Sequence, residues 1–413
     1  MTERDVVRAL AAVYMDIASL KKNKTLIEEW KNLNSLKPTR PMIWAKEFPW
    51  NEMNNSGELT LVCNDAICRS IEDYFRKTIY LFDHVHADYV ATPKFYVPII
   101  YTNTRQGLVE DFDKITTDEE NPIISRSYHG QIKNEADLDK IKMPTITVDR
   151  DKTIENFERV KELIGDIIPC ELAGEFTCWY APWDYLVQFW NPTDLLIDII
   201  DKPDLVHGAI RKFTDSWLKS LDLMDENNLL SFGEGNYGVG SGGLGFTDEL
   251  PGENYDPKHV HPKNQWGSST SQIFSDISPR QHYEFALQYE IEWLSRFGLT
   301  YYGCCEPLHD KIDIVRKIPN LRKISMSAWA NVEKMVDRVH GDYVLSFKPN
   351  PALLAGDSFN CEQAKEYISD MLDKVGDHPL EIIFKDISTL RNDPERLFEF
   401  IDITKELIEE RYE

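Results

Sequence analysis

The stretch that decides the fold spans residues 278–307 and reads SPRQHYEFALQYEIEWLSRFGLTYYGCCEP. Its first two thirds have the length and composition of a helix. Ser278 and Pro279 form a favoured N-cap and first-turn pair, and Gly298 is a typical stop. A short apolar run follows at 299–302 and ends in two cysteines and a glutamate. A helix that leads directly into a short apolar run predicts one unit of a parallel βα sheet.

Apolar runs of strand length recur along the chain, with helical patterns between many of them. We expect strands within 40–53, 87–100, 165–174, 227–236, 299–307, 321–330, 341–352 and 380–388. Seven or eight βα units in one chain predict an α/β fold, a single (β/α)8 TIM barrel with an N-terminal helical extension. The extension and first strand take residues 1–80, and 81–413 form the rest of one structural domain. A doubly wound open sheet is the alternative.

Composition excludes several classes of function. The 413 residues carry a formal charge of −24, so nucleic acid and anionic membranes are poor partners. Seven cysteines, an odd number, indicate reduced thiols and a cytoplasmic protein rather than a disulfide framework. The N-terminus lacks the apolar core of a signal peptide, and no run approaches the ~20 apolar residues that span a bilayer.

Polar and aromatic residues gather where the expected strands end. In a parallel barrel these ends meet at one face, which is where barrel enzymes hold their active sites. The candidate catalytic acids and bases are Glu47, Glu175, Glu249, Glu306 and His309. The candidate substrate-binding residues are Trp50, Trp179, Lys348, Asn350 and Lys385.

The adjacent pair Cys304 and Cys305 has two interpretations. Neighbours on a strand point to opposite faces, so we expect one thiol at the barrel mouth and the other in the core. In the structural interpretation, both cysteines are simply small hydrophobic residues buried in the core. The functional reading makes one cysteine, with Glu306 or His309, a metal or catalytic site, and Zn²⁺ is an ion that a thiolate binds well.

Two further motifs carry less specific signals. The glycine-rich stretch 233–252 contains the pattern GxGxxG, but the turn-like residues after it do not suit a dinucleotide site, and we expect a loop that covers the barrel mouth. The HVH motifs at 84–86 and 259–261 have no downstream partner at ligand spacing, so we expect ordinary histidines there.

Several of these stretches together resemble one family. RPMIWAKEFPWNEM (40–53), GGLGFTDELPG (242–252), YYGCCEPLHDKIDIVRKIPNLRKISMSAWA (301–330), SFKPNPALL (346–354) and EIIFKDISTL (381–390) are similar to the uroporphyrinogen decarboxylase-like superfamily. The resemblance is strongest to its subgroup from anaerobic bacteria, which is related to cobalamin-dependent methyltransferases. It implies a single (β/α)8 barrel with a cleft at the C-terminal face, and a homodimer.

The resemblance distinguishes two chemistries. The decarboxylase branch has the first-strand motif Met-Arg-Gln-Ala-Gly-Arg-Tyr, but this chain has AKEFPW at 45–50, without the arginines and with Glu47. An acidic pocket suits a polyanionic tetrapyrrole poorly. The methyltransferase branch has His-x-Cys after the fifth strand and a second cysteine after the eighth. Cys305, or Cys304, matches the first cysteine.

The rest of the methyltransferase motif is changed. Gly303 stands at the place of the histidine, and Lys385 or Asp386 replaces the second cysteine. The implied function is still methyl transfer from a small methylated substrate to a corrinoid, with Zn²⁺ held by Cys305, Cys304, Glu306 and His309. The chain lacks the corrinoid signature Asp-x-His-x-x-Gly, so a separate partner protein would carry the corrinoid. A decarboxylase of a small or aromatic acid, or a ligand-binding barrel without turnover, are the alternatives.

Overall fold

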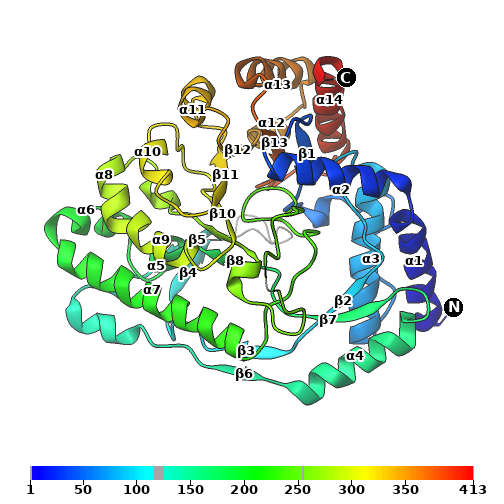
Figure 1. Ribbon diagram of the computed structural model, residues 1–413, viewed down its shortest axis with the longest axis horizontal. Helices are drawn as coiled ribbons and strands as arrows, with labels where there is room; N and C mark the ends of the chain where they lie inside the picture. The colour runs from blue at the N-terminus through cyan, green and yellow to red at the C-terminus, as the bar shows by residue number, and fades with distance from the viewer. Residues whose placement is uncertain (1, 116–124, 254, 413) are drawn as a thin grey trace.

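A seven-stranded parallel sheet forms the centre of the computed structural model, which describes residues 2–115, 125–253 and 255–412 (Figure 1). The strand order is β1-β13-β12-β11-β10-β9-β8. These strands are β1 (Met42–Ala45), β8 (Thr177–Tyr180), β9 (Trp266–Ser269), β10 (Leu299–Tyr302), β11 (Leu321–Met326), β12 (Val344–Phe347) and β13 (Leu380–Phe384). The α/β prediction is confirmed, and the curled sheet fits a TIM-like barrel.

A separate parallel pair of strands lies next in sequence to the edge strand β8. Strand β7 (Cys170–Ala173) directly precedes β8 and pairs with β2 (Phe95–Pro98). Ahead of β2, the backbone N–H of Asp88 donates to the carbonyl of Ile43 in β1 over 2.8 Å. Chain segments next to both edges of the seven-stranded sheet therefore take part in further backbone pairing.

Helices surround the sheet, and Figure 1 places α1, α3 and α4 together at the side away from α6 and α7. The longer helices are α1 (Glu3–Ala18), α2 (Lys21–Asn34), α3 (Ala66–His84), α4 (Arg150–Ile164), α6 (Pro192–Asp201), α7 (Pro203–Glu226), α11 (Val332–Val339), α13 (Cys361–Val375) and α14 (Glu395–Tyr412). Short ones are α5 (Pro182–Leu186), α8 (Pro279–His282), α9 (Gln288–Leu294), α10 (Ile312–Val315) and α12 (Ala352–Ala355). Two small antiparallel pairs lie outside the sheet: β3 (Tyr101–Asn103) with β6 (Ile146–Val148), and β4 (Phe112–Ile115) with β5 (Ser125–Tyr128). The expected N-terminal helices are present, and within the described ranges none of the helices has the length and apolarity needed to cross a bilayer.

Side chains alternate along the central strands between an apolar outer face and a polar inner face. Ile324 of β11 and Leu345 of β12 belong to the main hydrophobic core. Between such positions lie Lys323 and, on β13, Glu381, which form a fully buried ion pair of 2.8 Å inside the sheet. The interior of this sheet is therefore charged, and it needs partners for its polar groups.

The glycine-rich stretch supplies some of those partners. Residues 238–244 form a tight hairpin that lies inside the curled sheet, where Figure 1 draws green loops in the middle of the molecule. The N–H of Gly243 donates to Glu381 over 3.0 Å, and the carbonyl of Leu244 accepts from Lys323. The prediction of a loop over the mouth is therefore wrong, because glycine backbone can pack where side chains would not fit.

The fold-deciding stretch forms a helix followed by a strand, as predicted, but the helix is interrupted once and ends before the stop expected at Gly298. Ser278 caps the helix by accepting from the N–H of Gln281, and the helix ends at Leu294. A π-helical turn at Tyr283–Leu287 interrupts it. Elsewhere, the strand expected at 227–236 is reduced to a single bridge between Leu230 and Glu175. Strand β9 is an additional strand that the sequence does not predict, because three of its four residues are glycine and serine.

Candidate active site

Three lysines follow three neighbouring strands of the sheet. Lys46, Lys385 and Lys348 are the first residues after β1, β13 and β12. Because these strands are adjacent and parallel, their ends bring the three side chains to the same edge of the interior. All three are largely or fully buried. The sheet thus collects a cluster of positive charge at its C-terminal edge.

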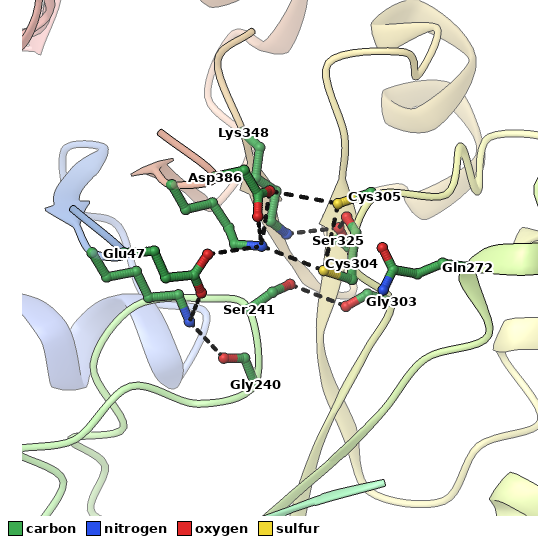
Figure 2. Close-up of polar contacts among 12 residues, drawn as sticks. Glu47, Gly240, Ser241, Gln272, Gly303, Cys304, Cys305, Ser325, Lys348 and Asp386 are labelled. Atoms are coloured by element: carbon green, nitrogen blue, oxygen red, sulfur yellow. Dashed lines mark hydrogen bonds and ion pairs between the residues drawn. The ribbon is translucent and has the colours of Figure 1, made fainter. Parts of the chain in front are cut away.

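Both cysteines of the CC pair face this cluster. Their Sγ atoms are 3.6 Å apart (Figure 2). The prediction that they point to opposite faces is wrong, because β10 ends at Tyr302 and Gly303 adopts φ +97°, which breaks the strand alternation before Cys304. A Cβ at Gly303 would lie 2.8 Å from the Cβ of Ser325, so glycine is required here.

Lys385 is the centre of the polar contacts. Its Nζ lies 3.4 Å from the Sγ of Cys304, 2.9 Å from Asp386 and 3.5 Å from Glu47 (Figure 2). Asp386 also accepts from the thiol of Cys305 over 3.5 Å. Burial lowers the pKa of Lys385, but the charges of Cys304, Glu47 and Asp386 outweigh it and raise the pKa above its ordinary value.

Lys348 is held from the other side of the cavity. Its Nζ donates to the hydroxyls of Tyr301 and Ser325 and to the carbonyl of Ser346, over 2.5 to 3.1 Å. Complete burial lowers its pKa to about 7, and the nearby Lys385 adds to that effect. This lysine can therefore exchange a proton near neutral pH.

The Cys304 thiol is poised to ionise. A hydrogen bond from Cys305 lowers its pKa to about 7; burial opposes this shift, and the lysines at 385 and 348 reinforce it. The same contact with Cys304, together with burial, raises the pKa of Cys305. Cys304 is thus the cysteine of the pair that ionises near neutral pH, and Cys305 is the one that stays protonated.

These groups line a cavity of about 380 Å³. Trp329 lies on its rim with 69% of its surface exposed, and Asn350 lies on its wall beside Lys348. The tip of the glycine hairpin lies behind it: Lys46 donates to the carbonyl of Gly240 over 2.8 Å, and Ser241 contacts the Tyr301 hydroxyl and the Gly303 carbonyl. A larger cavity, of about 890 Å³, lies near Lys94 and Phe176 and contains none of the sequence-predicted site residues.

Six of the predicted site residues meet here. Cys304, Cys305, Lys348, Asn350 and Lys385 line the cavity, and Glu47 contacts Lys385. Sequence reasoning did not select Lys46, although its position directly after β1 matches that of Lys348 and Lys385 after their strands. Nor did it select Tyr301, which looks like an ordinary aromatic residue within a strand.

Two predicted residues lie close to the cavity but have structural contacts. Glu306 is fully buried and accepts from the Thr270 hydroxyl and the Cys304 N–H over 2.8 and 2.9 Å. It therefore holds the turn after β10 against the end of β9. His309 accepts from the N–H of Asn331 over 3.2 Å, and burial lowers its pKa.

The remaining predicted residues lie elsewhere. Glu175 accepts from Tyr101 over 2.8 Å and shares a separate cavity with Trp179. Glu249 pairs with Arg322 near the start of β11, at the opposite end of the sheet. Trp50 packs against Phe48 and Tyr80.

The residues expected to bind zinc do not form a three-ligand group. Within the described residues, ligand atoms of His, Cys, Asp and Glu lie close enough together to hold a metal ion in two other places. One of these groups consists of Asp225 and the two histidines of the second HVH motif, His259 and His261. At the CC pair, the Lys385 ammonium lies between the Cys304 thiol and the two carboxylates. A donor set that already encloses a positive charge fits a zinc ion poorly.

Comparison with known proteins adds a fold relationship. Neither a family model nor a curated protein matches the chain. Among solved structures, a methyltransferase from Methanosarcina mazei aligns over 94% of this chain and 99% of its own, with a TM-score of 0.50 and 12% sequence identity. At this identity the likeness shows a shared fold.

Proposed function

We propose that the chain is an enzyme of methyl-group transfer that acts on a small methylated substrate in the cavity at the ends of β10, β12 and β13. The observation that carries the proposal is the convergence of Lys348, Lys385 and the Cys304 thiol at this cavity. The fold shared with a methyltransferase supports the same reaction class.

The proposed chemistry follows from the charge that develops on the atom from which the methyl group is removed. When the bond between the methyl carbon and an oxygen or nitrogen breaks toward an incoming nucleophile, the bonding electron pair stays on the leaving atom. Buried ammonium groups stabilise that developing charge. Lys348, with a pKa of about 7, is the group that would donate a proton to the leaving atom.

The methyl acceptor belongs to the same proposal. A corrinoid on a separate partner protein, when bound at the cavity mouth, would supply a strong nucleophile for the methyl group. This chain's own part is then to bind the substrate beside Trp329 and Asn350 and to provide the positive charge and the proton.

The test uses free reduced cobalamin as the acceptor. The protein is incubated with methoxylated aromatic acids, methylated amines or methylated thiols, and methylcobalamin is followed by absorbance. We expect one class to react, and Lys348→Met to react at least about tenfold more slowly because a general acid is lost. Lys334→Met, an exposed lysine paired with Asp310, is the matched control. No methylcobalamin from any class, or equal rates in wild type and Lys348→Met, would contradict the proposal.

A decarboxylase of a small or aromatic acid is the second candidate. The position of Lys348 next to Asn350 in the cavity wall favours it, because these side chains could hold a carboxylate. This reaction would release carbon dioxide from a carboxyl-labelled acid without cobalamin. Release of carbon dioxide together with no methyl transfer would replace the first proposal by the second.

A further inference from the structure

The Lys385 ammonium has the surroundings of a bound cation. Its Nζ donates hydrogen bonds to the Cys304 sulfur over 3.4 Å and to Asp386 over 2.9 Å, and it forms an ion pair with a Glu47 oxygen 3.5 Å away. The lysine side chain is 5% exposed, so water contributes little to its solvation. A sulfur and two carboxylates are also ligand types that a divalent metal uses. Among the described residues, however, these three do not form one of the groups whose ligand atoms lie close enough together to hold a metal ion, and the ammonium occupies the space between them.

The backbone aims both carboxylates at this point. Glu47 follows β1 and Asp386 follows β13, and both adopt the left-handed conformation, with φ of 60° and 57°. Residues other than glycine take this conformation at a cost in free energy, and it is concentrated at functional sites. The two strands are paired in register up to Ala45 and Phe384, so these turns stand side by side.

We infer that Lys385 is the built-in cation of this site: its ammonium takes the place of a divalent metal between the Cys304 sulfur and the carboxylates of Asp386 and Glu47. Lys385 is thus a positioning residue for Cys304. A metal ion could enter only if the ammonium left, because both would need the same sulfur and carboxylate atoms. This inference concerns the cavity of the proposed function but does not depend on which reaction occurs there.

The first test measures metal content instead of turnover. All variants carry His261→Ala and Cys68→Ala, which disrupt the two other groups of possible metal ligands. After incubation with zinc and desalting, we expect no zinc with Lys385 in place, and about one zinc per chain in Lys385→Cys, where a third thiolate replaces the ammonium. Two results would overturn the inference. One is that the protein that retains Lys385 binds zinc stoichiometrically and loses it in Cys304→Ala or Cys305→Ala. The other is that Lys385→Cys fails to bind zinc.

The second test measures thiol reactivity. Iodoacetamide labelling at neutral pH is followed by peptide mass spectrometry, which separates Cys304 from the other cysteines. We expect Lys385→Met to slow the labelling of Cys304 by about fivefold, because a one-unit rise from a thiol pKa of about 7 lowers the thiolate fraction at pH 7 from about one half to about one tenth. Lys385→Arg should restore most of the rate, and Lys334→Met should leave it unchanged. An unchanged rate in Lys385→Met would show that the ammonium does not hold the thiolate. Because neither test uses a substrate, both can succeed when the methyl-transfer assay fails.

Discussion

Single residues set the charge of the site, and Cys304 shows how. Its thiol receives a hydrogen bond from Cys305 and lies close to Lys385 and Lys348, so its pKa falls to about 7 despite burial. We predict that its alkylation rate reaches half of its maximum near pH 7. In Cys305→Ala the pH of half-maximal alkylation should rise, because the hydrogen bond that contributes most to stabilising the Cys304 thiolate is lost. A midpoint at the ordinary thiol value in both proteins would refute this account.

Lys348 gives a prediction for stability at the same scale. Its pKa is about 7 in the folded protein and has its ordinary, higher value in the unfolded chain. Between these values the unfolded state binds one proton more than the folded state, so raising the pH stabilises the fold. We therefore expect the unfolding midpoint of wild type to rise relative to Lys348→Met between about pH 7 and 10. Lys334→Met is the control, and a flat difference for Lys348→Met would show that the buried lysine is not neutralised.

At the scale of elements, the glycine hairpin at 238–244 allows a specific prediction about stability. A Cβ at Gly242 would meet Glu381 and would lie 2.7 Å from the ring of Tyr301. We expect Gly242→Ala to destabilise the protein by about 1–3 kcal/mol, the usual range for overpacking a tight interior. Gly130→Ala is the control, because its nearest neighbour would be 3.5 Å away. Equal unfolding midpoints in urea for the two variants would mean that the hairpin is not packed in the interior.

The same elements show how far sequence reasoning reaches. Strands β10 to β13 are predictable, because each is an apolar run that ends in polar residues, and their parallel arrangement brings Cys304, Lys348 and Lys385 together. Strand β9, at Trp266–Ser269, is not, since buried glycine and serine resemble a loop. Glu175 was placed at the cavity because the chain after β7 looks like a loop, whereas it continues into β8.

The site's inner details depended on backbone conformations that no residue pattern reveals. Gly303 turns both thiols to one side, and the left-handed turns at Glu47 and Asp386 bring their carboxylates to Lys385. The pairing of Glu249 with Arg322 likewise depends on the path that the chain takes after the hairpin inside the curled sheet. Such features arise from tertiary packing, which can override the local alternation of a strand.

At the scale of the whole molecule, the formal charge of −24 sets the response to salt. Long-range repulsion between like charges is screened beyond about 10 Å at 0.1 M salt, while close ion pairs such as Lys77 with Asp73, at 2.8 Å, are screened much less. Such exposed pairs also contribute little, about 0–1 kcal/mol each. Salt should therefore remove more repulsion than attraction and stabilise the fold.

We predict that the thermal unfolding midpoint at pH 7.5, a pH at which the carboxylates are charged, rises by roughly a few degrees between low salt and about 0.3 M NaCl. Potassium chloride should give the same rise, because screening depends on ionic strength and not on the identity of the cation. The rise should shrink as the pH approaches the isoelectric point of about 4.9, where the net charge vanishes. A midpoint that falls with salt at pH 7.5 would instead mean that attractive pairs dominate the electrostatic free energy of this acidic fold.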